Sequence, residues 1–444
     1  MKTGLIESAL FFAALSSCLY AQDEVIDENA LFSDTSMFVD STEISASFSM
    51  GAVESTQMSF SGEITSAAEI SAKRDYFKNG DRKTLDPGAY VVGNFLLDAR
   101  FPAGIKAFAN AEAHHLADSG KSRFYLQEIF VDANINRRVY FRTGKQVLQW
   151  GRCFFWNPTD LINIEKKKFI QDIGYREGTY GIKMHIPVGT RWNFYTFLDM
   201  NRLTSVDSLA GAAKVEFLLG NTEVGTALWV KENRYPYLGI DFSTSLFDIS
   251  FAGEASLTSG DNYTVFVQDT SSPLKFRPAT INREVVARVC LSASKMFDLM
   301  NVDDRVSVNA EVYYNQAGYT GNKLRDYDVK DAVEKIMELP ESDPMKSEMQ
   351  SMSGAFLEPN NHSRLYGALF MSISKFIISD LTLTVNGILN FNHRCAVIST
   401  GLQYRNLHNF SLGFLVNAIV GPEESEYTLF DDAASLRLTA GVSF

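Results

Sequence analysis

Hydrophobic and polar residues alternate along much of this chain, so that every second side chain is apolar. The last ten residues show the pattern most clearly, because Leu436, Leu438, Ala440, Val442 and Phe444 share one face of an extended strand. A soluble sandwich seldom ends on an apolar strand, since chain ends usually fray. A transmembrane β-barrel needs such a strand, with lipid on its outer face and polar surroundings inside. The pattern therefore favours a barrel over a sandwich.

The same alternation recurs in segments of about ten to fourteen residues, close to the length that a tilted strand needs to cross a bilayer. We expect an all-β fold, a transmembrane antiparallel β-barrel of about 18 strands over residues 57–444, with 16 strands as the alternative. The expected strands are 58–73, 89–100, 104–115, 123–134, 138–150, 177–186, 191–200, 208–219, 222–232, 235–245, 247–257, 283–296, 305–316, 363–375, 381–391, 394–405, 409–419 and 433–444.

The connections between these segments differ in length in a regular way. Counted from a periplasmic N-terminus, every second connection is short, as at 101–103 and 135–137, and the others are mostly long, as at 317–362. A tight turn at Asn392-His393 is the exception among the expected outer loops. Short periplasmic turns that alternate with long outer loops are typical of outer-membrane barrels. The largest outer loop also has an apolar face of helical spacing at 328–339, which predicts a helix there.

The N-terminus has the pattern of an export leader. Lys2 supplies a positive charge, residues 9–15 are apolar, and small residues precede a polar run after Ala21, so we expect a signal peptide at 1–21. The alternative is a lipoprotein signal that would acylate Cys18. Residues 22–56 are acidic and then Ser-rich, which predicts a periplasmic tail that is too short and polar for a convincing plug.

Composition excludes several classes of function. The formal net charge of −12 makes nucleic acid a poor partner, and the chain has no stretch of 18 apolar residues for a transmembrane helix. After the leader, Cys153, Cys290 and Cys395 remain, an odd number without metal-ligand spacing, so we expect no metal, no cofactor and no disulfide framework. Catalytic motifs are absent from the sequence, which predicts that the protein is not an enzyme.

One hairpin predicts a row of charges on the lumen wall. If Tyr125 and Gln127 face outward on the strand 123–134, alternation turns the acidic residues inward, and it turns the basic residues of the next strand inward as well. The side chains expected to line the pore here are Glu128, Asp132, Arg138 and Arg142. A turn centred near Asn136 places Asp132 diagonal to both arginines. These charges either satisfy one another in the wall or help to select solutes.

The residues after this hairpin form an unusual motif. Gly144-Lys-Gln is followed by Trp150-Gly151 and then by Trp156-Asn157-Pro158-Thr159-Asp160, where Asn-Pro with a following Asp is strong turn chemistry. Together with Glu128 and Asp132, the motif resembles a family of poorly characterised porin-like outer-membrane β-barrels with a Gly-(Arg/Lys)-Gln…Trp-Gly…Asn-Pro-(Thr/Val)-Asp signature. The resemblance is close over residues 128–160 only. It implies a barrel that passes small solutes and names no substrate.

The motif opens the third outer loop, 151–176, which is long, aromatic and basic. We hypothesise that this loop folds inward, packs on the lumen wall and narrows the pore, because an aromatic-rich loop with a buried turn is poorly suited to water. A positive potential would then come from Arg152, Lys166, Lys167 and Lys168, with Arg142, Lys183 and His185 from the wall. The alternative is that the motif only seals the barrel or guides its assembly.

These patterns predict an outer-membrane porin-like channel for small hydrophilic solutes. A plugged structural barrel or surface adhesin, and a transporter of hydrophobic compounds, are the alternatives. The expected partners are outer-membrane lipid, small solutes and the barrel-assembly machinery, because the terminal Phe444 resembles the assembly signal of outer-membrane barrels. A homo-oligomer is left open.

Overall fold

The computed structural model describes residues 55–444 apart from 81, 103, 118–119, 161, 163–177, 202–208, 263, 270–275, 281–283, 301, 332–333, 335–359, 407–408 and 430. The expected signal peptide 1–21 with Cys18, nearly all of the tail 22–56, and Lys166, Lys167 and Lys168 lie outside the described residues. Those expectations therefore stay predictions.

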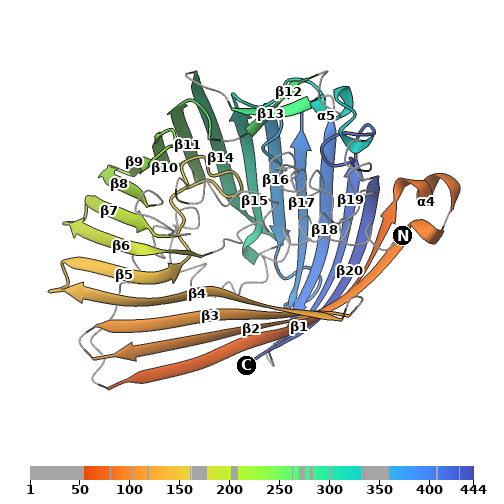
Figure 1. The fold of residues 1–444 in the computed structure, drawn as a ribbon. Helices are drawn as coiled ribbons and strands as arrows, with labels where there is room; N and C mark the ends of the chain where they lie inside the picture. The colour runs from red at the N-terminus through yellow and green to blue at the C-terminus, as the bar shows by residue number, and fades with distance from the viewer. Residues whose placement is uncertain are drawn as a thin grey trace.

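The dominant element is one antiparallel sheet of 18 strands. Each strand is hydrogen-bonded to the next along the chain, and the last is bonded to the first, so the sheet closes into a barrel, as Figure 1 shows. The strands are β1 (Gln57–Lys73), β2 (Leu85–Phe101), β3 (Ile105–Leu116), β4 (Lys121–Ile135), β5 (Val139–Gln146), β6 (Thr179–Val188), β7 (Trp192–Asp199), β8 (Ala210–Leu219), β9 (Thr222–Lys231), β10 (Tyr237–Leu246), β11 (Ile249–Ser259), β14 (Val285–Leu299), β15 (Val302–Asn315), β16 (Leu365–Ile373), β17 (Leu381–Asn390), β18 (Cys395–Arg405), β19 (Phe410–Val420) and β20 (Asp432–Ser443). The prediction of 18 strands is confirmed.

The last strand closes the barrel as the sequence predicts. β20 pairs with β1 from Glu63 opposite Ser443 to Lys73 opposite Asp432. The terminal residue extends this ladder, since Gly62 N donates to Phe444 O at 3.0 Å and Phe444 N donates to Gly62 O at 2.9 Å. A closed ladder removes the exposed edges that an open sheet would present.

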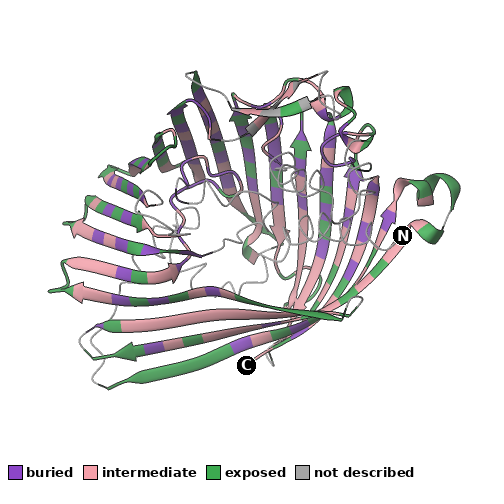
Figure 2. Ribbon diagram, viewed as in Figure 1, coloured by how far each residue is buried: buried purple, intermediate pink, exposed green. Residues whose placement is uncertain are grey.

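Burial follows the period-two pattern. On β20, Leu438 and Val442 are 51% and 50% exposed, whereas Ser435 and Arg437 are each 3% exposed. Apolar side chains therefore point away from the barrel, and polar side chains point into it, as a lipid-embedded barrel requires. Figure 2 shows the same alternation of buried and exposed positions along the strands β6 to β11.

The connections confirm the predicted difference in loop length. Tight turns with left-handed residues join β4 to β5 at Asn136 and Arg137, and β10 to β11 at Phe247 and Asp248. The other end of the barrel carries the long connections, such as 147–178 between β5 and β6 and 316–364 between β15 and β16. The tight turn at Asn392-His393 between β17 and β18 is also as predicted.

Three details of the β4–β5 hairpin differ from the prediction. Tyr125 lies directly opposite the inward-facing Glu112, and its ring centroid is 5.0 Å from that of His114, so its predicted outward orientation is wrong. The register of β4 against β3 shifts between Leu126 and Glu128, so Gln127 is an extra residue of a β-bulge. The bulge turns Gln127 toward the lumen, where its amide donates to Glu112 Oε2 at 2.9 Å, and the predicted outward orientation is wrong. The turn is centred at Arg137 rather than Asn136, which places Asp132 directly opposite Arg142 instead of diagonal to it.

Short helices and one short hairpin lie in the connections between the strands of the barrel. They are α4 (Arg74–Asn79), the 3₁₀ turn η2 (Arg82–Thr84), α5 (Lys323–Asp326) and a separate hairpin of β12 (Thr264–Gln268) and β13 (Phe276–Thr280). Of the helix expected at 328–339, residues 329–331 and 334 are helical, and the rest lies outside the described residues. In the described part of the chain, helices of a length and apolarity sufficient to span a membrane do not occur.

Candidate functional site

The chain leaves the barrel wall at the end of β5 and turns into the lumen. β5 ends at Gln146, four residues before the predicted end at Trp150. The next N–H, of Val147, donates to Glu128 Oε1 at 2.7 Å instead of continuing the ladder. Residues 147–160, which we call the inward segment, then lie against the inner faces of strands on the far side of the barrel, as Figure 1 shows.

The carboxylate of Glu254, on β11, holds this segment at Arg152 and Cys153 and again at Thr159. Its Oε1 accepts the backbone N–H groups of Arg152 and of Cys153, the latter at 2.6 Å. Its Oε2 accepts the N–H of Thr159 at 3.0 Å and the Thr159 hydroxyl at 2.7 Å. A buried carboxylate with this many donors fixes the backbone strongly, because charge-assisted hydrogen bonds are roughly twice as strong as neutral ones.

Glu311, on β15, holds the middle of the segment in the same way. It accepts the N–H of Phe154 at Oε1, and the N–H groups of Phe155 and Trp156 at Oε2, at 3.0 and 3.1 Å. Three consecutive amides thus converge on one side chain from the opposite wall. Glu254 and Glu311 together satisfy backbone groups that would otherwise be buried without partners.

Arg152 is the charged anchor of the inward segment. Its guanidinium bonds Asp241 on β10, Glu216 on β8 at 3.0 Å and Glu223 on β9 at 2.6 Å. Lys214 on β8 joins the cluster and donates to the carbonyl of Trp150 at 2.7 Å. Burial opposes the charge of Arg152, but the three carboxylates outweigh it and raise the pKa of Arg152 above its ordinary value.

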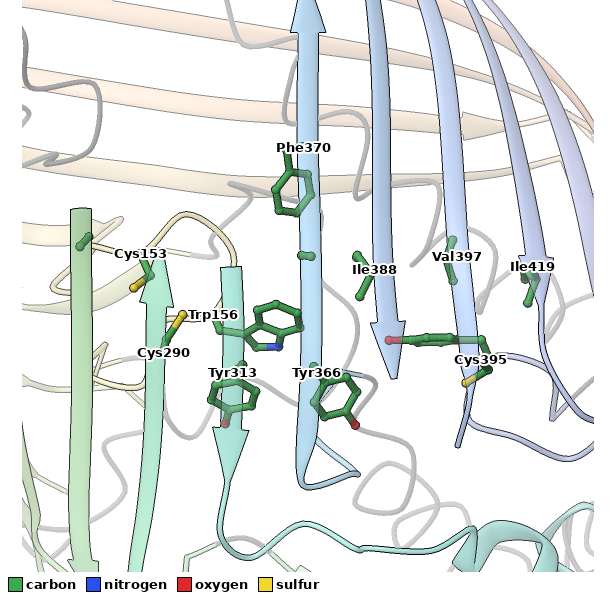
Figure 3. Close-up of a cluster of buried hydrophobic side chains, with 13 residues drawn as sticks. Cys153, Trp156, Cys290, Tyr313, Tyr366, Phe370, Ile388, Cys395, Val397 and Ile419 are labelled. Carbon is green, nitrogen blue, oxygen red and sulfur yellow. The ribbon is translucent and has the colours of Figure 1, made fainter. Parts of the chain in front are cut away.

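The two tryptophans of the motif seat the segment in two apolar clusters. Trp150 is buried with Leu148, Tyr195 and Trp229. Trp156 stacks on Tyr313 with ring centroids 5.4 Å apart and donates from Nε1 to the carbonyl of Asn360 at 2.9 Å, and Figure 3 shows it between the strands β15 and β16. Buried aromatic pairs of this kind add to the stability of a contact beyond the area they bury.

The remaining motif residues shape the backbone. Asp160 N donates to the carbonyl of Asn157 at 3.1 Å, which closes the Asn-Pro turn around Pro158, and Asp160 is fully buried. Gly151 allows the turn to close, because a Cβ there would lie 2.3 Å from Asn157 Oδ1. The motif therefore fixes the position of the segment against the wall.

The predicted basic wall residues are buried. Arg142 pairs with Asp132 through two contacts of 2.6 and 2.9 Å, and Lys183 lies opposite Arg142 on β6 with 1% exposure. His185 stacks on Tyr195, with ring centroids 4.5 Å apart. Arg138 is not brought to this group, since it lies exposed in the turn between β4 and β5. Arg142 and Arg152 thus face carboxylates rather than an open pore.

The inner face of β2 and β3 is more open than the face under the inward segment. β3 is half-buried along nearly its whole length, as Figure 2 shows, whereas the inward positions of β8 and β11 are buried. The open face carries charges of both signs, among them Asp98, which bonds Lys106 at 3.1 Å.

Sequence patterns did not identify the residues that hold the inward segment, namely Lys214, Glu216, Asp241, Glu254 and Glu311. Each lies on a strand at a position that alternation assigns to the lumen. Single ionisable residues at inward positions of otherwise apolar or small-residue strands were the available signal. Nothing in the local sequence indicates that these residues converge on the inward segment, because the partners are far apart in the chain; Arg152 and Glu254, for example, are separated by 102 residues.

Comparison with known proteins supports the architecture. The sequence matches neither a protein-family model nor a curated protein. The crystal structure of OccAB4 from Acinetobacter baumannii is similar, with a TM-score of 0.51 and 7% identity over 88% of this chain and 99% of that chain. OccK2 (OpdF) from Pseudomonas aeruginosa, crystallised in complex with glucuronate, has a TM-score of 0.50 and 8% identity over 89% and 99%. The chain has the fold of an outer-membrane porin. At such identities the likeness concerns the fold alone.

Proposed function

We propose that this protein is a porin-like channel of a bacterial outer membrane, through which small hydrophilic solutes diffuse. One observation carries the proposal: the inward segment is seated by Glu254, Glu311 and Arg152 on one wall, while the inner face of β2 and β3 stays half-buried. The segment narrows the lumen of a barrel that would otherwise be wide. Passage then takes place between the segment and the open face.

The polarity of the open face favours hydrophilic solutes over hydrophobic compounds. Its described inward residues include Asp98 and Lys106 as well as Glu112, which accepts hydrogen bonds from the side chains of its neighbours. A solute with hydroxyl or charged groups can replace water at such positions. The similar channel OccK2 was crystallised with glucuronate, a small polar solute of this kind.

Ion selectivity, in this proposal, rests on the lysines that follow the inward segment. Arg142 and Arg152 have carboxylate partners in the wall, so the positive charge of the path comes from Lys166, Lys167 and Lys168. We expect a preference for anions that Lys166→Glu weakens. Reversal potentials of single channels in a salt gradient measure it, and an unchanged reversal potential in the variant contradicts this part of the proposal.

Solute flux into proteoliposomes tests the channel itself. Refolded protein should let small sugars equilibrate quickly and should exclude larger oligosaccharides, because the seated segment limits the width of the path. Barrel folding is verified in the same sample by heat-modifiable mobility on a gel. Folded barrels whose vesicles take up no more sugar than empty vesicles would refute the proposal in favour of a plugged structural barrel.

A further inference from the structure

Two cysteines that are distant in sequence meet where the inward segment touches the wall. Cys153 belongs to the segment and Cys290 to β14, and they are 1% and 0% exposed. Both Sγ atoms and a carboxylate oxygen of Glu311 lie within 4.8 Å of one another. Figure 3 shows the two sulfur atoms side by side between the segment and the strand. The third described cysteine, Cys395, lies on β18.

We propose that Cys153 and Cys290 form a disulfide that fastens the inward segment to the barrel wall. The crosslink rests on the geometry of the two thiols and on export from the cytoplasm, and its effect on conductance rests on the proposed function. Proteins exported to the outer membrane fold in an oxidising compartment, where paired thiols become disulfides. The bond would join the segment to β14 beside the amides that Glu311 already holds.

The reaction is a thiol–disulfide exchange with a disulfide carrier of the periplasm or with glutathione disulfide. One cysteine thiolate attacks the carrier disulfide, whose S–S bond breaks as a mixed disulfide forms. The second thiolate attacks the mixed disulfide and releases the reduced carrier, which is a dithiol for a protein carrier and two molecules of glutathione for glutathione disulfide. Two electrons pass from the cysteine pair to the carrier, and the two protons of the pair end on the carrier's thiols. Atoms and charge therefore balance without a metal or molecular oxygen.

The thiol–disulfide exchange takes place while the protein folds, before the inward segment is seated. In the seated state the hydrogen bond with Cys290 and burial raise the pKa of the Cys153 thiol well above its ordinary value, so little thiolate is present. Before the segment is seated, Cys153 is accessible to a carrier. Seating then brings Cys290 into reach and completes the bond.

A metal ion is the competing occupant of this cluster. Glu311 is a poor third ligand, because its oxygens already accept the N–H groups of Phe154, Phe155 and Trp156. A closed structural zinc site also needs four ligands, whereas this group offers three. The geometry therefore favours the disulfide.

The test of the crosslink is peptide mapping by mass spectrometry on protein taken from membranes with thiols trapped by N-ethylmaleimide. We expect a peptide pair joined through Cys153 and Cys290, lost on reduction and absent in Cys153→Ser. The matched control Cys395→Ser should retain it. Recovery of both cysteines as trapped thiols, pairing of either with Cys395, or stoichiometric zinc on reduced thiols would each overturn the proposal.

Single-channel recording tests the effect of the crosslink on conductance. Arg152→Met removes the charged anchor of the segment, so an oxidised sample should keep the wild-type conductance and a sample reduced with dithiothreitol should show larger steps. The same treatment should leave Cys153→Ser/Arg152→Met unchanged, because that variant has no crosslink to break. Equal conductance of Arg152→Met before and after reduction contradicts the fastening role. Absence of channels in the wild type would contradict the proposed function and leave the peptide map to judge the crosslink.

Discussion

Replacing Arg152 by methionine should weaken the attachment of the inward segment to the wall, most clearly when Cys153 and Cys290 are reduced. Methionine keeps an apolar stem of similar length and removes the charge that Glu216, Glu223 and Asp241 share. With the segment seated, Lys214 is then the one cation that the described residues place in the cluster, at 2.8 Å from Glu216 and 3.2 Å from Asp241. With the segment away, water can reach these carboxylates, so the substitution favours the unseated state.

The size of the effect follows from the burial of the partners. Removing one member of a buried ion pair costs about 3–5 kcal/mol, since a buried charge loses its counter-charge. The lower end applies here, because Lys214 still serves two of the three carboxylates and the side chain of Glu223 is 24% exposed. A cost of about 3 kcal/mol corresponds to a shift on the order of 100-fold between the seated and unseated states.

Hydrogen exchange reads this equilibrium at the amides that Glu254 and Glu311 hold. In reduced Arg152→Met, the amides of residues 152–156 and Thr159 should exchange on the order of 100-fold faster than in the reduced wild type. Arg437→Met is the matched control, because Arg437 is equally buried but pairs with Glu69 at the β1–β20 seam. Unchanged exchange at residues 152–159, or faster exchange in every strand alike, would refute the assignment of Arg152 as an anchor of the segment.

Three further predictions follow from other contacts. Arg142→Ala should lower the free energy of unfolding in urea by about 3–5 kcal/mol, because Asp132 is fully buried and loses its two-point partner; a change below about 1 kcal/mol, the range of an exposed pair, would contradict it. Deleting Phe444 should lower the yield of refolding into lipid vesicles, followed by gel mobility, since its ring packs 5.8 Å from that of Phe60 and its backbone bonds Gly62; an unchanged yield would show that the closure does not need it. Burial lowers the pKa of His362 to about 3 and that of His393 to about 4, below the unfolded value of 6.5. As the pH falls from 6.5 to about 4, the unfolded form of these turns therefore takes up protons before the folded form does, and the stability of the turns falls. The opening free energy of the amides at 391–395, obtained from hydrogen exchange after correction for the intrinsic exchange rate at each pH, should therefore fall over that range, and a pH-independent value would refute the sign.

Much of the barrel could be predicted from the sequence because each strand carries its own signal. Alternation at Ser435 to Phe444 specifies which face points away from the barrel, and tight turns such as 136–138 mark one end of the barrel. The bulge at Gln127 could not be predicted, because an extra residue in one strand depends on its pairing with β3 rather than on local composition.

The candidate site could be predicted only in part, because local sequence patterns identify the motif but not its partners. The motif from Trp150 to Asp160 predicts a buried turn in the third outer loop, and the described residues of that loop do lie against the wall. The partners of the motif come from strands that are distant in sequence, such as Glu311, which is 157 residues from Phe154. The odd number of cysteines likewise gave no sign that Cys153 lies close to Cys290, because the two residues come together only in the folded barrel.

Single-channel recording of the wild-type protein in a planar lipid bilayer tests the central claim most directly. The account predicts discrete ion-conducting steps from refolded barrels, with a conductance that rises when the inward segment is released in reduced Arg152→Met. Folded barrels that insert into the bilayer and give no steps, in the wild type and in the reduced variant alike, would contradict a narrowed aqueous path along the open face of β2 and β3.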